Sequence, residues 1–392
     1  MNKTLQDETN TLALATRLNR PHADATGTIA PPIYQSSLFG FESFQDFEDT
    51  VSGNSNHPIY TRVSNETVTA FETLMADAEN GEAAVAFSSG MAAISSTLLA
   101  FLKPGDRVVC IEHVYPDSFR LFEKMLRPFG VETSYHSIEE MENNPDLMAG
   151  AKLAYLESPN SMMMQAMDLP KVAAHARNHG AITVIDNSWA TPVFQRPIEL
   201  GIDIVLHSAS KYISGHSDVV AGVVIASAEH IAAIRTMSLT LLGGKLAPFE
   251  AWLLTRGLRT LPIRMQAHQA TANLFVEKLT AHPMIRAVHS PAAGSVPGLE
   301  GRSGLLSVEI APEGDIRTLV DSLKLFRLGV SWGGFESLVV PTAISLKQKD
   351  PTNSLQAFKV SDRIIRLSLG LEDANDLWAD FEQGLAACRS NR

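Results

Sequence analysis

Short apolar runs alternate with longer mixed segments between Phe71 and Ala226. Such runs are typical of buried strands, and the segments between them are long enough for the crossover helix that parallel strands require. We expect strands at Ala83 to Phe87, Arg107 to Ile111, Lys152 to Leu156, Ala181 to Ile185, Ile202 to Leu206 and Val219 to Ala226. The pattern therefore predicts an α/β domain around a largely parallel sheet.

The regions on either side of this pattern are different. Pro31, Pro32 and the glycine- and asparagine-rich stretch Gly53 to Pro58 indicate an irregular, extended segment with too little core to fold alone. We expect residues 1–60 to form an N-terminal arm that contacts a neighbouring subunit. Residues 61–255 then form the α/β domain, and residues 256–392 form a smaller C-terminal domain with an initial helix and an α+β pattern.

The composition narrows the class of protein. The chain has 392 residues, of which 45% are hydrophobic and 19% charged, as is ordinary for a globular protein of two or three domains. A net charge of −11 argues against nucleic acid or an anionic membrane as partner. The two cysteines give no disulfide framework, Met1 to Glu8 is too polar for a signal peptide, and no run approaches the ~18 apolar residues of a membrane span. We expect a cytoplasmic protein.

Candidate functional groups follow the carboxyl ends of the predicted strands. Lys211 comes after Ile202 to Leu206, among small hydroxyl residues and a glycine. Burial disfavours the charged amine and frees its lone pair, so such a lysine can form a Schiff base with the aldehyde of pyridoxal 5'-phosphate. The hydroxyls of Ser208 and Ser210 are close enough in sequence to reach the phosphate of that cofactor. The pattern Ser-x-Ser-Lys also occurs in loops whose lysine has no catalytic role. The assignment of Lys211 to the cofactor therefore depends on other segments.

Two of these segments support it. Asp186 follows Ala181 to Ile185, at the edge where open parallel sheets bind ligands, and a carboxylate there can keep the pyridine nitrogen protonated. The alternative is a structural aspartate that caps the next helix. Gly90 and Met91 open a helix after Ala83 to Phe87, and the free N–H groups of a helix start can hold a phosphate. There is no Gly-x-Gly-x-x-Gly or Walker pattern that would favour a nucleotide instead.

Three further features concern aromatic, basic and metal-binding groups. Tyr115 follows a predicted strand and can lie face to face with a flat cofactor ring. Tyr60 and Arg62 stand two apart and project to the same side of an extended segment, where the arginine can bind a phosphate, although a surface arginine is the commoner explanation for a single Tyr-x-Arg. His175 and His179 have a metal-ligand spacing on a predicted helix, but the helix dipole explains a histidine at its C-terminal end. We expect no metal site.

Together these segments resemble the Cys/Met-metabolism family of pyridoxal-phosphate enzymes, over nearly the whole chain and in order. The segments that carry the resemblance are Tyr60-x-Arg62, Ser88-Ser89-Gly90-Met91-Ala92-Ala93, Asp186-Asn187, the stretch around Lys211, and Arg366-Leu367-Ser368-Leu369-Gly370-Leu371-Glu372-Asp373. The family includes cystathionine β-lyase, cystathionine γ-lyase, cystathionine γ-synthase and methionine γ-lyase. The resemblance implies the pyridoxal-phosphate-dependent transferase-like fold of the aspartate aminotransferase type, and a homotetramer built from two dimers.

The resemblance also implies roles for single residues. Lys211 would be the Schiff-base lysine and general base, Asp186 the partner of the pyridine nitrogen, and Tyr115 the residue stacked on the ring. The other cofactor ligands would be Gly90, Met91, Ser208 and Ser210, with Tyr60 and Arg62 contributed by the partner subunit. Tyr60 would join Lys211 and Tyr115 as a catalytic residue. Arg366 lies in an apolar run where an unpaired guanidinium is costly, and it would bind the α-carboxylate of the amino-acid substrate.

The substrate pocket gives mixed signals. Ser331-Trp332-Gly333-Gly334 resembles bacterial cystathionine β-lyases, in which the tryptophan lines the pocket, although a core tryptophan is the alternative. Tyr60-Thr61-Arg62-Val63 resembles the γ-enzymes more closely. Val330 stands where β-lyases have tyrosine and γ-enzymes glutamate. Asp117, where methionine γ-lyases have cysteine, suggests a carboxylate for a cationic substrate tail, such as the second ammonium of cystathionine or the guanidinooxy group of canavanine.

We therefore expect a lyase that eliminates a heteroatom leaving group, closest to a cystathionine β-lyase-like carbon–sulfur lyase that releases pyruvate, ammonia and a thiol. The alternative is a γ-lyase or γ-synthase that acts on cystathionine, methionine, a homoserine ester or canavanine. A transaminase and a cofactor-binding protein without turnover are the other classes. The presence of Lys211, Tyr115 and Arg366 disfavours the last of these.

Overall fold

The structure, a computed structural model, describes residues 13–22 and 27–389. The polar segment Met1 to Glu8, which argued against a signal peptide, lies outside the described residues. No helix within the described ranges is long and apolar enough to cross a membrane.

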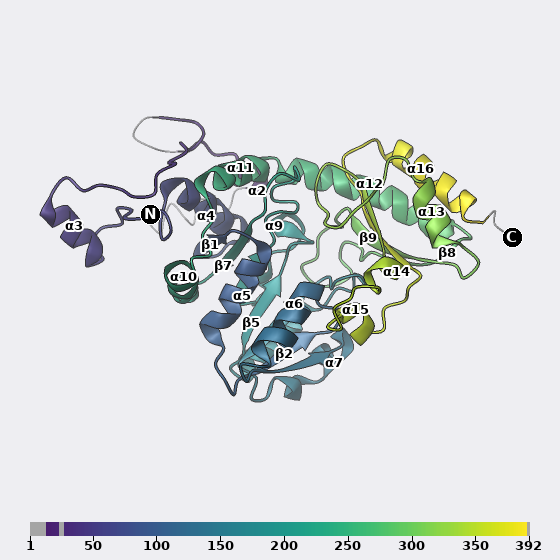
Figure 1. Ribbon diagram of the computed structural model, residues 1–392, viewed down its shortest axis with the longest axis horizontal. Helices are drawn as coiled ribbons and strands as arrows, with labels where there is room; N and C mark the ends of the chain where they lie inside the picture. Colours follow the sequence, from purple (N-terminus) through teal and green to yellow (C-terminus); the bar gives the residue numbers. More distant parts are fainter. Residues whose placement is uncertain (1–12, 23–26, 390–392) are drawn as a thin grey trace.

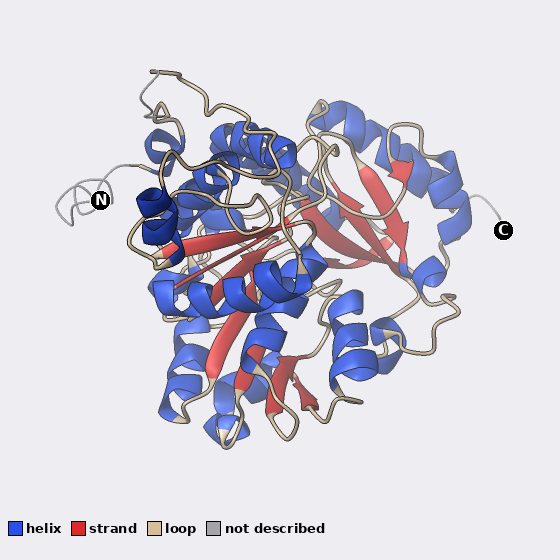
Figure 2. Cartoon of the chain, turned by 60° about the vertical axis from the view of Figure 1, so that its left-hand side comes forward, coloured by secondary structure: helices blue, strands red, loops and turns tan. Residues whose placement is uncertain are grey.

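A seven-stranded sheet forms the centre of the large domain (Figures 1 and 2), in the order β1-β7-β6-β5-β4-β2-β3. β7 runs antiparallel to β1 and β6, and the other neighbouring strands are parallel. The strands are β1 (Ala83–Phe87), β2 (Arg107–Ile111), β3 (Glu132–His136), β4 (Leu153–Glu157), β5 (Ile182–Asp186), β6 (Ile204–His207) and β7 (Gly222–Ala226). The predicted α/β domain with a largely parallel sheet is confirmed.

Helices cover both faces of this sheet (Figure 2). Along β1, Val85 and Phe87 pack in one core with α5, whereas Ala84 and Ala86 pack in a second core with α4 and α11. Successive side chains of a strand point to opposite faces, so both faces are buried. The helices are α4 (Glu66–Glu79), α5 (Gly90–Phe101), α6 (Pro116–Arg120), α7 (Ile138–Asn143), α8 (Leu169–Asn178), α9 (Thr191–Phe194), α10 (Ala228–Arg235) and α11 (Pro248–Arg259). Turns of π-helix at Leu121–Leu126 and Thr236–Leu242 extend α6 and α10, and 3-10 turns lie at Pro145–Met148 and Pro197–Leu200.

Two strands differ from the predicted pattern. β3 was not predicted because its sequence, Glu-Thr-Ser-Tyr-His, is polar, and as an edge strand it is only partly buried. The run predicted from Val219 begins as a strand only at Gly222. The backbone of Ala221 instead exchanges hydrogen bonds with Ser210, beside Lys211.

The C-terminal domain contains a second sheet in the order β10-β11-β12-β9-β8, antiparallel except between β10 and β11. Its strands are β8 (Ile285–His289), β9 (Leu305–Ile310), β10 (Arg327–Leu328), β11 (Leu338–Pro341) and β12 (Ile364–Ser368). Its helices are α12 (Leu261–Ala281), α13 (Ile316–Ser322), α14 (Thr342–Ser345), α15 (Ser354–Ala357) and α16 (Ala374–Ala387). This is the expected smaller α+β unit. The boundary predicted between residues 255 and 256 falls within α11.

The described part of the N-terminal arm contains two short helices, α2 (Leu14–Leu18) and α3 (Phe44–Val51). α3 projects from the rest of the chain, at the left of Figure 1, and buries none of its residues. Phe44 is 82% exposed and Val51 is 66% exposed. The arm therefore presents apolar side chains that this chain alone does not cover.

Candidate active site

The predicted functional residues meet in a cavity of about 420 Å³ between the carboxyl ends of the sheet strands and the C-terminal domain. Each of β4, β5 and β6 ends at this cavity, as open parallel sheets place their ligands. The predicted residues that line it are Gly90, Met91, Tyr115, Asp186, Ser208, Ser210, Lys211, Ser331, Trp332 and Arg366. Groups from both domains therefore surround one volume.

Lys211 follows β6, and its amine lies inside this cavity. Nζ donates a hydrogen bond to Oγ of Ser331 at 2.5 Å and lies 5.5 Å from the centre of the Trp332 ring. Burial and the positive charge of Arg366 together lower the pKa of Lys211 to about 8, although the charge of Asp186 opposes both. A substantial fraction of this amine is therefore neutral and nucleophilic near neutral pH.

Asp186 is the last residue of β5, and its side chain is held by Ser188. Oδ1 of Asp186 accepts hydrogen bonds from the Ser188 hydroxyl at 2.5 Å and the Ser188 backbone N–H at 2.9 Å. Burial raises the pKa of Asp186, whereas the two Ser188 hydrogen bonds and the charges of His207 and Lys211 lower it. The Ser188 hydroxyl also accepts from the backbone N–H of Ser208 at 2.6 Å, so it connects the ends of β5 and β6.

The start of α5 forms one end of the cavity. Ser89 caps this helix by accepting from the N–H of Ala92, which leaves the N–H groups of Gly90 and Met91 without a helical partner. A Cβ added at Gly90 would lie 2.9 Å from Oγ of Ser208, so only glycine leaves this space open. Ser210 also lines the cavity, but its hydroxyl is engaged with the Ala221 backbone.

Tyr115 and Glu157 form the side of the cavity next to Asp186. Glu157, at the end of β4, is buried and accepts from the Tyr115 backbone N–H at 2.8 Å. Burial and the charge of Asp186 raise the pKa of Glu157 well above its usual value. Burial and Asp117 raise the pKa of Tyr115, so its phenol stays protonated near neutral pH.

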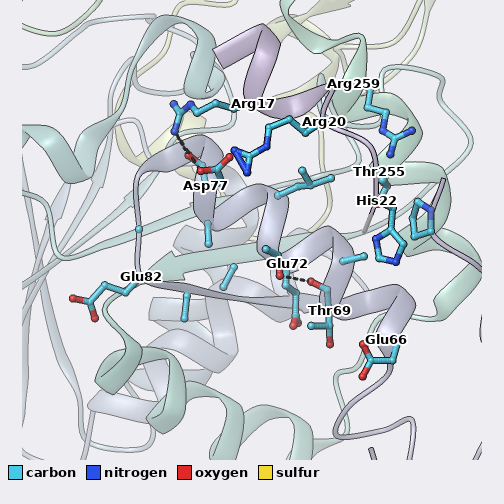
Figure 3. Close-up of a pocket in the computed structure, with 18 of the residues that line it drawn as sticks. Arg17, Arg20, His22, Glu66, Thr69, Glu72, Asp77, Glu82, Thr255 and Arg259 are labelled. Atoms are coloured by element: carbon cyan, nitrogen blue, oxygen red, sulfur yellow. Dashed lines mark hydrogen bonds and ion pairs between the residues drawn. The ribbon is translucent and has the colours of Figure 1, made fainter. Parts of the chain in front are cut away.

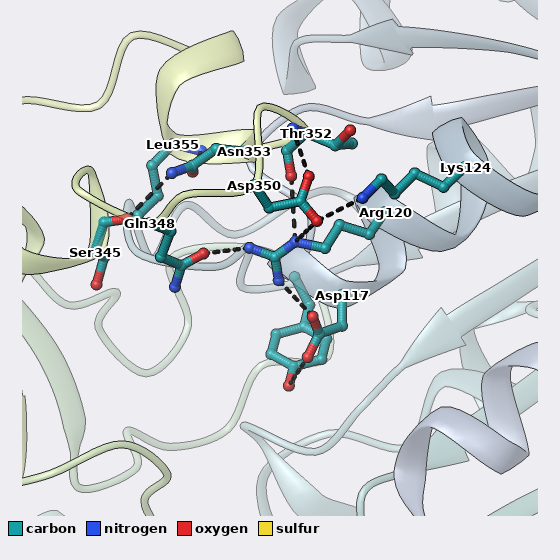
Figure 4. Close-up of polar contacts among 10 residues, drawn as sticks. Asp117, Arg120, Lys124, Ser345, Gln348, Asp350, Thr352, Asn353 and Leu355 are labelled. Atoms are coloured by element: carbon teal, nitrogen blue, oxygen red, sulfur yellow. Dashed lines mark hydrogen bonds and ion pairs between the residues drawn. The ribbon is translucent and has the colours of Figure 1, made fainter.

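Asp117 belongs to a polar network that joins α6 to the C-terminal domain (Figure 4). Its carboxylate accepts from the Tyr115 hydroxyl at 3.0 Å and is ion-paired with Arg120. The Arg120 guanidinium also donates to Gln348 and to the Thr352 carbonyl oxygen. The carboxylate predicted to meet a cationic substrate tail therefore already has a cationic partner, and it does not line the cavity.

The C-terminal domain supplies the opposite wall through Ser331, Trp332 and Arg366. The Arg366 guanidinium donates one hydrogen bond, to the Ser331 carbonyl oxygen at 3.0 Å, within the described residues. Burial lowers the pKa of Arg366 to about 10, so the group remains cationic at neutral pH. Gly333 has φ +83°, and a Cβ there would lie 2.8 Å from the backbone nitrogen of Tyr212. This close approach seats the wall directly against the Lys211 segment.

Tyr60 and Arg62 do not reach the Lys211 cavity of their own chain. Arg62 donates to the carbonyl oxygens of Leu239 and Thr240, and the Tyr60 ring lies beside it. Both line a separate hollow with Ser37 and Lys245. Their predicted contribution across a subunit boundary remains a prediction.

Two other features lie outside this site. A cavity of about 800 Å³ is lined by α4, α11 and the arm, with an Arg17–Asp77 ion pair at one side (Figure 3), and it contains none of the predicted site residues. His175 lies 3.2 Å from the Met141 carbonyl oxygen, and His179 follows the end of α8. In the part of the chain that the structure describes, no group of three or more potential ligands is placed to hold a metal ion.

The geometry fits pyridoxal 5'-phosphate. Lys211 offers an amine for the aldehyde, Asp186 a buried carboxyl group for the ring nitrogen, and the α5 start a pocket for the phosphate. The predicted list lacked Ser188 and Glu157, which order Asp186 and Tyr115. Their only signal in the sequence is a hydroxyl two residues after Asp186 and a carboxylate at the end of a buried strand.

Comparisons with known proteins agree with this geometry. Residues 10–386 match the model of a family described as Cys/Met metabolism PLP-dependent enzyme. The chain is 36% identical to L-methionine gamma-lyase of Pseudomonas putida, over 93% of this chain and 94% of that protein. It is 35% identical to cystathionine beta-lyase of Lactococcus lactis subsp. cremoris, over 92% of this chain and 94% of that protein.

A solved structure shows the same fold. Cystathionine gamma synthase of Xanthomonas oryzae pv. oryzae superposes with a TM-score of 0.88 at 33% sequence identity, covering 97% of this chain and 100% of that chain. The matches thus include β-lyases, γ-lyases and γ-synthases. The chain belongs to the Cys/Met-metabolism family of pyridoxal-phosphate-dependent enzymes, and pyridoxal 5'-phosphate is its cofactor.

Proposed function

We propose that the protein is a cystathionine β-lyase-like carbon–sulfur lyase that converts L-cystathionine and water into homocysteine, pyruvate and ammonia. The observation that carries the proposal is the wall formed by Ser331 and Trp332 beside the Lys211 amine. The Trp332 ring gives this side of the cavity an apolar surface close to the amine that we propose accepts the α-proton. This wall is the part of the cavity in which the sequence resembles β-lyases.

Lys211 and Asp186 carry the proton chemistry. When bound, pyridoxal phosphate stores the electron pair that remains when the α-proton leaves. Lys211 has a pKa near 8 and accepts that proton, while Asp186 holds a proton at the ring nitrogen. Ser188 keeps the Asp186 carboxylate in place through two hydrogen bonds.

Arg366 and Tyr115 orient the substrate and its leaving group. Arg366 keeps N–H groups free for the α-carboxylate, because its guanidinium bonds only the Ser331 carbonyl oxygen among the described residues. The Tyr115 phenol remains protonated near neutral pH, so it can donate a proton to a departing thiolate. β-Elimination needs no further base, whereas γ-elimination requires a second proton removal at the β-carbon.

A γ-lyase or γ-synthase is the second candidate. It is favoured by the Tyr60 to Val63 segment and by relatives named as γ-lyases. Recognition of a cationic tail by Asp117 is the weaker part of this alternative, because Arg120 already pairs with that carboxylate.

The exposed arm and the position of Tyr60 and Arg62 support a homotetramer. Tyr60 is 45% exposed and outside its own Lys211 cavity, which suits a role in a neighbouring subunit's site. Both cysteines are free thiols, which supports a cytoplasmic location. Sedimentation analysis of the intact protein tests the assembly: a monomer at micromolar concentration would contradict it.

Two small thioethers test the proposed reaction. S-Methyl-L-cysteine carries its leaving group on the β-carbon and L-methionine on the γ-carbon, and the same methanethiol leaves from both. We expect kcat/KM for S-methyl-L-cysteine to exceed that for L-methionine by at least about tenfold, which corresponds to ~1.4 kcal/mol in the transition state. A preference for L-methionine would favour the γ-lyase instead.

A further inference from the structure

A buried pair of ionisable side chains lies directly behind the cofactor site. Oε1 of Glu79, the last residue of α4, lies 2.6 Å from Nε2 of His207 at the end of β6. Both side chains have no exposed surface. Titratable groups are seldom fully buried, and when they are, they are usually paired as these two are. The burial of two ionisable groups at this position is costly, which suggests that the pair serves the neighbouring site.

The pair is connected to both strands that carry cofactor ligands. His207 immediately precedes Ser208, and the same Glu79 oxygen accepts from Nδ2 of Asn187, at 3.0 Å, immediately after Asp186. One carboxylate oxygen therefore holds the ends of β5 and β6 together, one residue away from Asp186 and Ser208.

The network continues to β4. Asn187 also donates to the Gln195 carbonyl oxygen at 2.9 Å, and Gln195 donates to the Ser158 carbonyl oxygen at 3.1 Å. Ser158 follows Glu157, the buried carboxylate beside Tyr115. A polar layer of Glu79, Asn187, Gln195 and His207 thus underlies three strand ends of the site, and none of its members lines the cavity.

We propose that Glu79 and His207 form a buried ion pair that positions Asp186 and Ser208 and supplies a positive charge near the Asp186 carboxylate. Asp186 must be ionised to pair with a protonated pyridine nitrogen, but burial opposes its charge. A positive charge on His207, held 2.6 Å from the Glu79 carboxylate, lowers the pKa of Asp186 and so offsets that cost. The inference rests on the cofactor of the family and is independent of which bond of the substrate breaks.

Other charged groups also act on Asp186, and they do not replace this pair. Lys211 favours the Asp186 carboxylate, whereas Glu157 opposes it from β4. When the cofactor is bound, the Lys211 amine would be joined to its aldehyde, and the charge of this residue would change. His207 does not line the cavity, so its effect on Asp186 does not depend on that bond.

Cofactor affinity as a function of pH tests the proposal. In Glu79→Gln the amide keeps the shape of the carboxylate but removes the negative charge that pairs with His207, so we expect Asp186 to lose this electrostatic support and to protonate at a higher pH. We expect the dissociation constant of pyridoxal phosphate from the apoprotein to rise about tenfold at pH 7. We also expect the acid limb, where affinity falls with falling pH, to move up by about one pH unit. His207→Gln should reproduce both changes.

Glu72→Gln is the matched control. Glu72 is also a buried carboxylate on α4, but it pairs with Arg235 and accepts from the Ala86 backbone N–H, outside the polar layer. It should lower the melting temperature of the apoprotein while changing cofactor affinity less than about twofold. If Glu79→Gln and His207→Gln lower the melting temperature but leave the affinity and its pH profile as in the unmodified protein, the pair is only structural and the proposal is wrong.

Discussion

The floor and the wall of the active-site cavity are built differently. The floor is the edge of the parallel sheet, where Asp186 and Lys211 follow strands that are buried on both faces. The wall comes from the irregular segment between β10 and β11 of the C-terminal domain, where Ser331 has φ +77° and is followed by Trp332. The two regions meet through the Lys211–Ser331 hydrogen bond.

This difference separates two functions. The floor positions groups that every reaction of the family needs, because the cofactor and the α-proton are the same in each. In our proposal, Ser331 and Trp332 of the wall face the part of the substrate that differs between reactions, whereas Arg366 binds the α-carboxylate that all these substrates share. Changes in the floor should therefore abolish all activity, whereas changes in the wall should redirect or weaken it.

The largest effect is expected for Lys211 in the floor. Lys211→Ala removes the group that we propose accepts the α-proton, and we expect kcat to fall by more than about 10³-fold for every amino-acid substrate. Lys211→Arg keeps a positive charge but cannot accept a proton near neutral pH, and it should be equally inactive. Steady-state assays with S-methyl-L-cysteine measure this, and retention of a tenth of the activity in either variant would contradict the role.

Substitution of Arg366 should have the next largest effect. We expect it to weaken substrate binding more than it slows turnover. Arg366→Ala removes the charged group that we propose binds the α-carboxylate, so we expect kcat/KM to fall about 10²-fold, mainly through KM. Arg366→Lys keeps the charge but loses the paired N–H groups, and it should recover only part of this loss. An unchanged KM in the alanine variant would place the substrate carboxylate elsewhere.

The pH dependence of cofactor uptake tests the electrostatics of the floor. Only the neutral amine of Lys211 reacts with an aldehyde, and its pKa is lowered to about 8. The rate at which the apoprotein takes up pyridoxal phosphate should rise about tenfold per pH unit below pH 8 and level off above it. Stopped-flow absorbance measures this rate. A rate that is still rising steeply near pH 10 would indicate an unperturbed lysine.

A substitution at Trp332 tests directly whether the wall determines substrate preference. Trp332→Leu keeps the wall apolar but shortens it, and we expect the preference for S-methyl-L-cysteine over L-methionine to fall about tenfold, with cofactor affinity unchanged. Trp252→Leu, on α11 and outside the cavity lining, is the matched control. Loss of cofactor binding in Trp332→Leu alone would assign this residue to the floor.

The smallest effect is expected for Asp117. Because Arg120 already pairs with its carboxylate, Asp117→Asn should change the preference for L-canavanine over L-methionine by less than about threefold. Arg120→Gln leaves the carboxylate without this partner and should increase that preference. A loss of tenfold or more in Asp117→Asn would instead support direct recognition of a cationic tail.

The same division explains what could be predicted from the sequence. Asp186 and Lys211 each follow a continuous apolar run, so both their place at the sheet edge and their chemistry were predicted before the fold was known, and the cofactor was correct. β3 was missed because an edge strand with one solvent-facing side carries few apolar residues.

The contacts around the cavity were harder to predict, because they join residues that are distant in the sequence. Sequence could not show that Arg120, from α6, pairs with Asp117 and also contacts Gln348 in the C-terminal domain. Glu79 gave no signal either, because it is an ordinary glutamate at the end of an amphipathic helix until the fold brings it to His207.

L-Cystathionine tests the central claim most directly, because one molecule carries both bonds that the family breaks. The purified holoenzyme is incubated with L-cystathionine, and the 2-oxo acid and thiol released are identified by mass spectrometry. Pyruvate with homocysteine is the predicted result and establishes β-elimination at the Trp332 wall. 2-Oxobutyrate with cysteine would contradict the proposal and identify a γ-lyase.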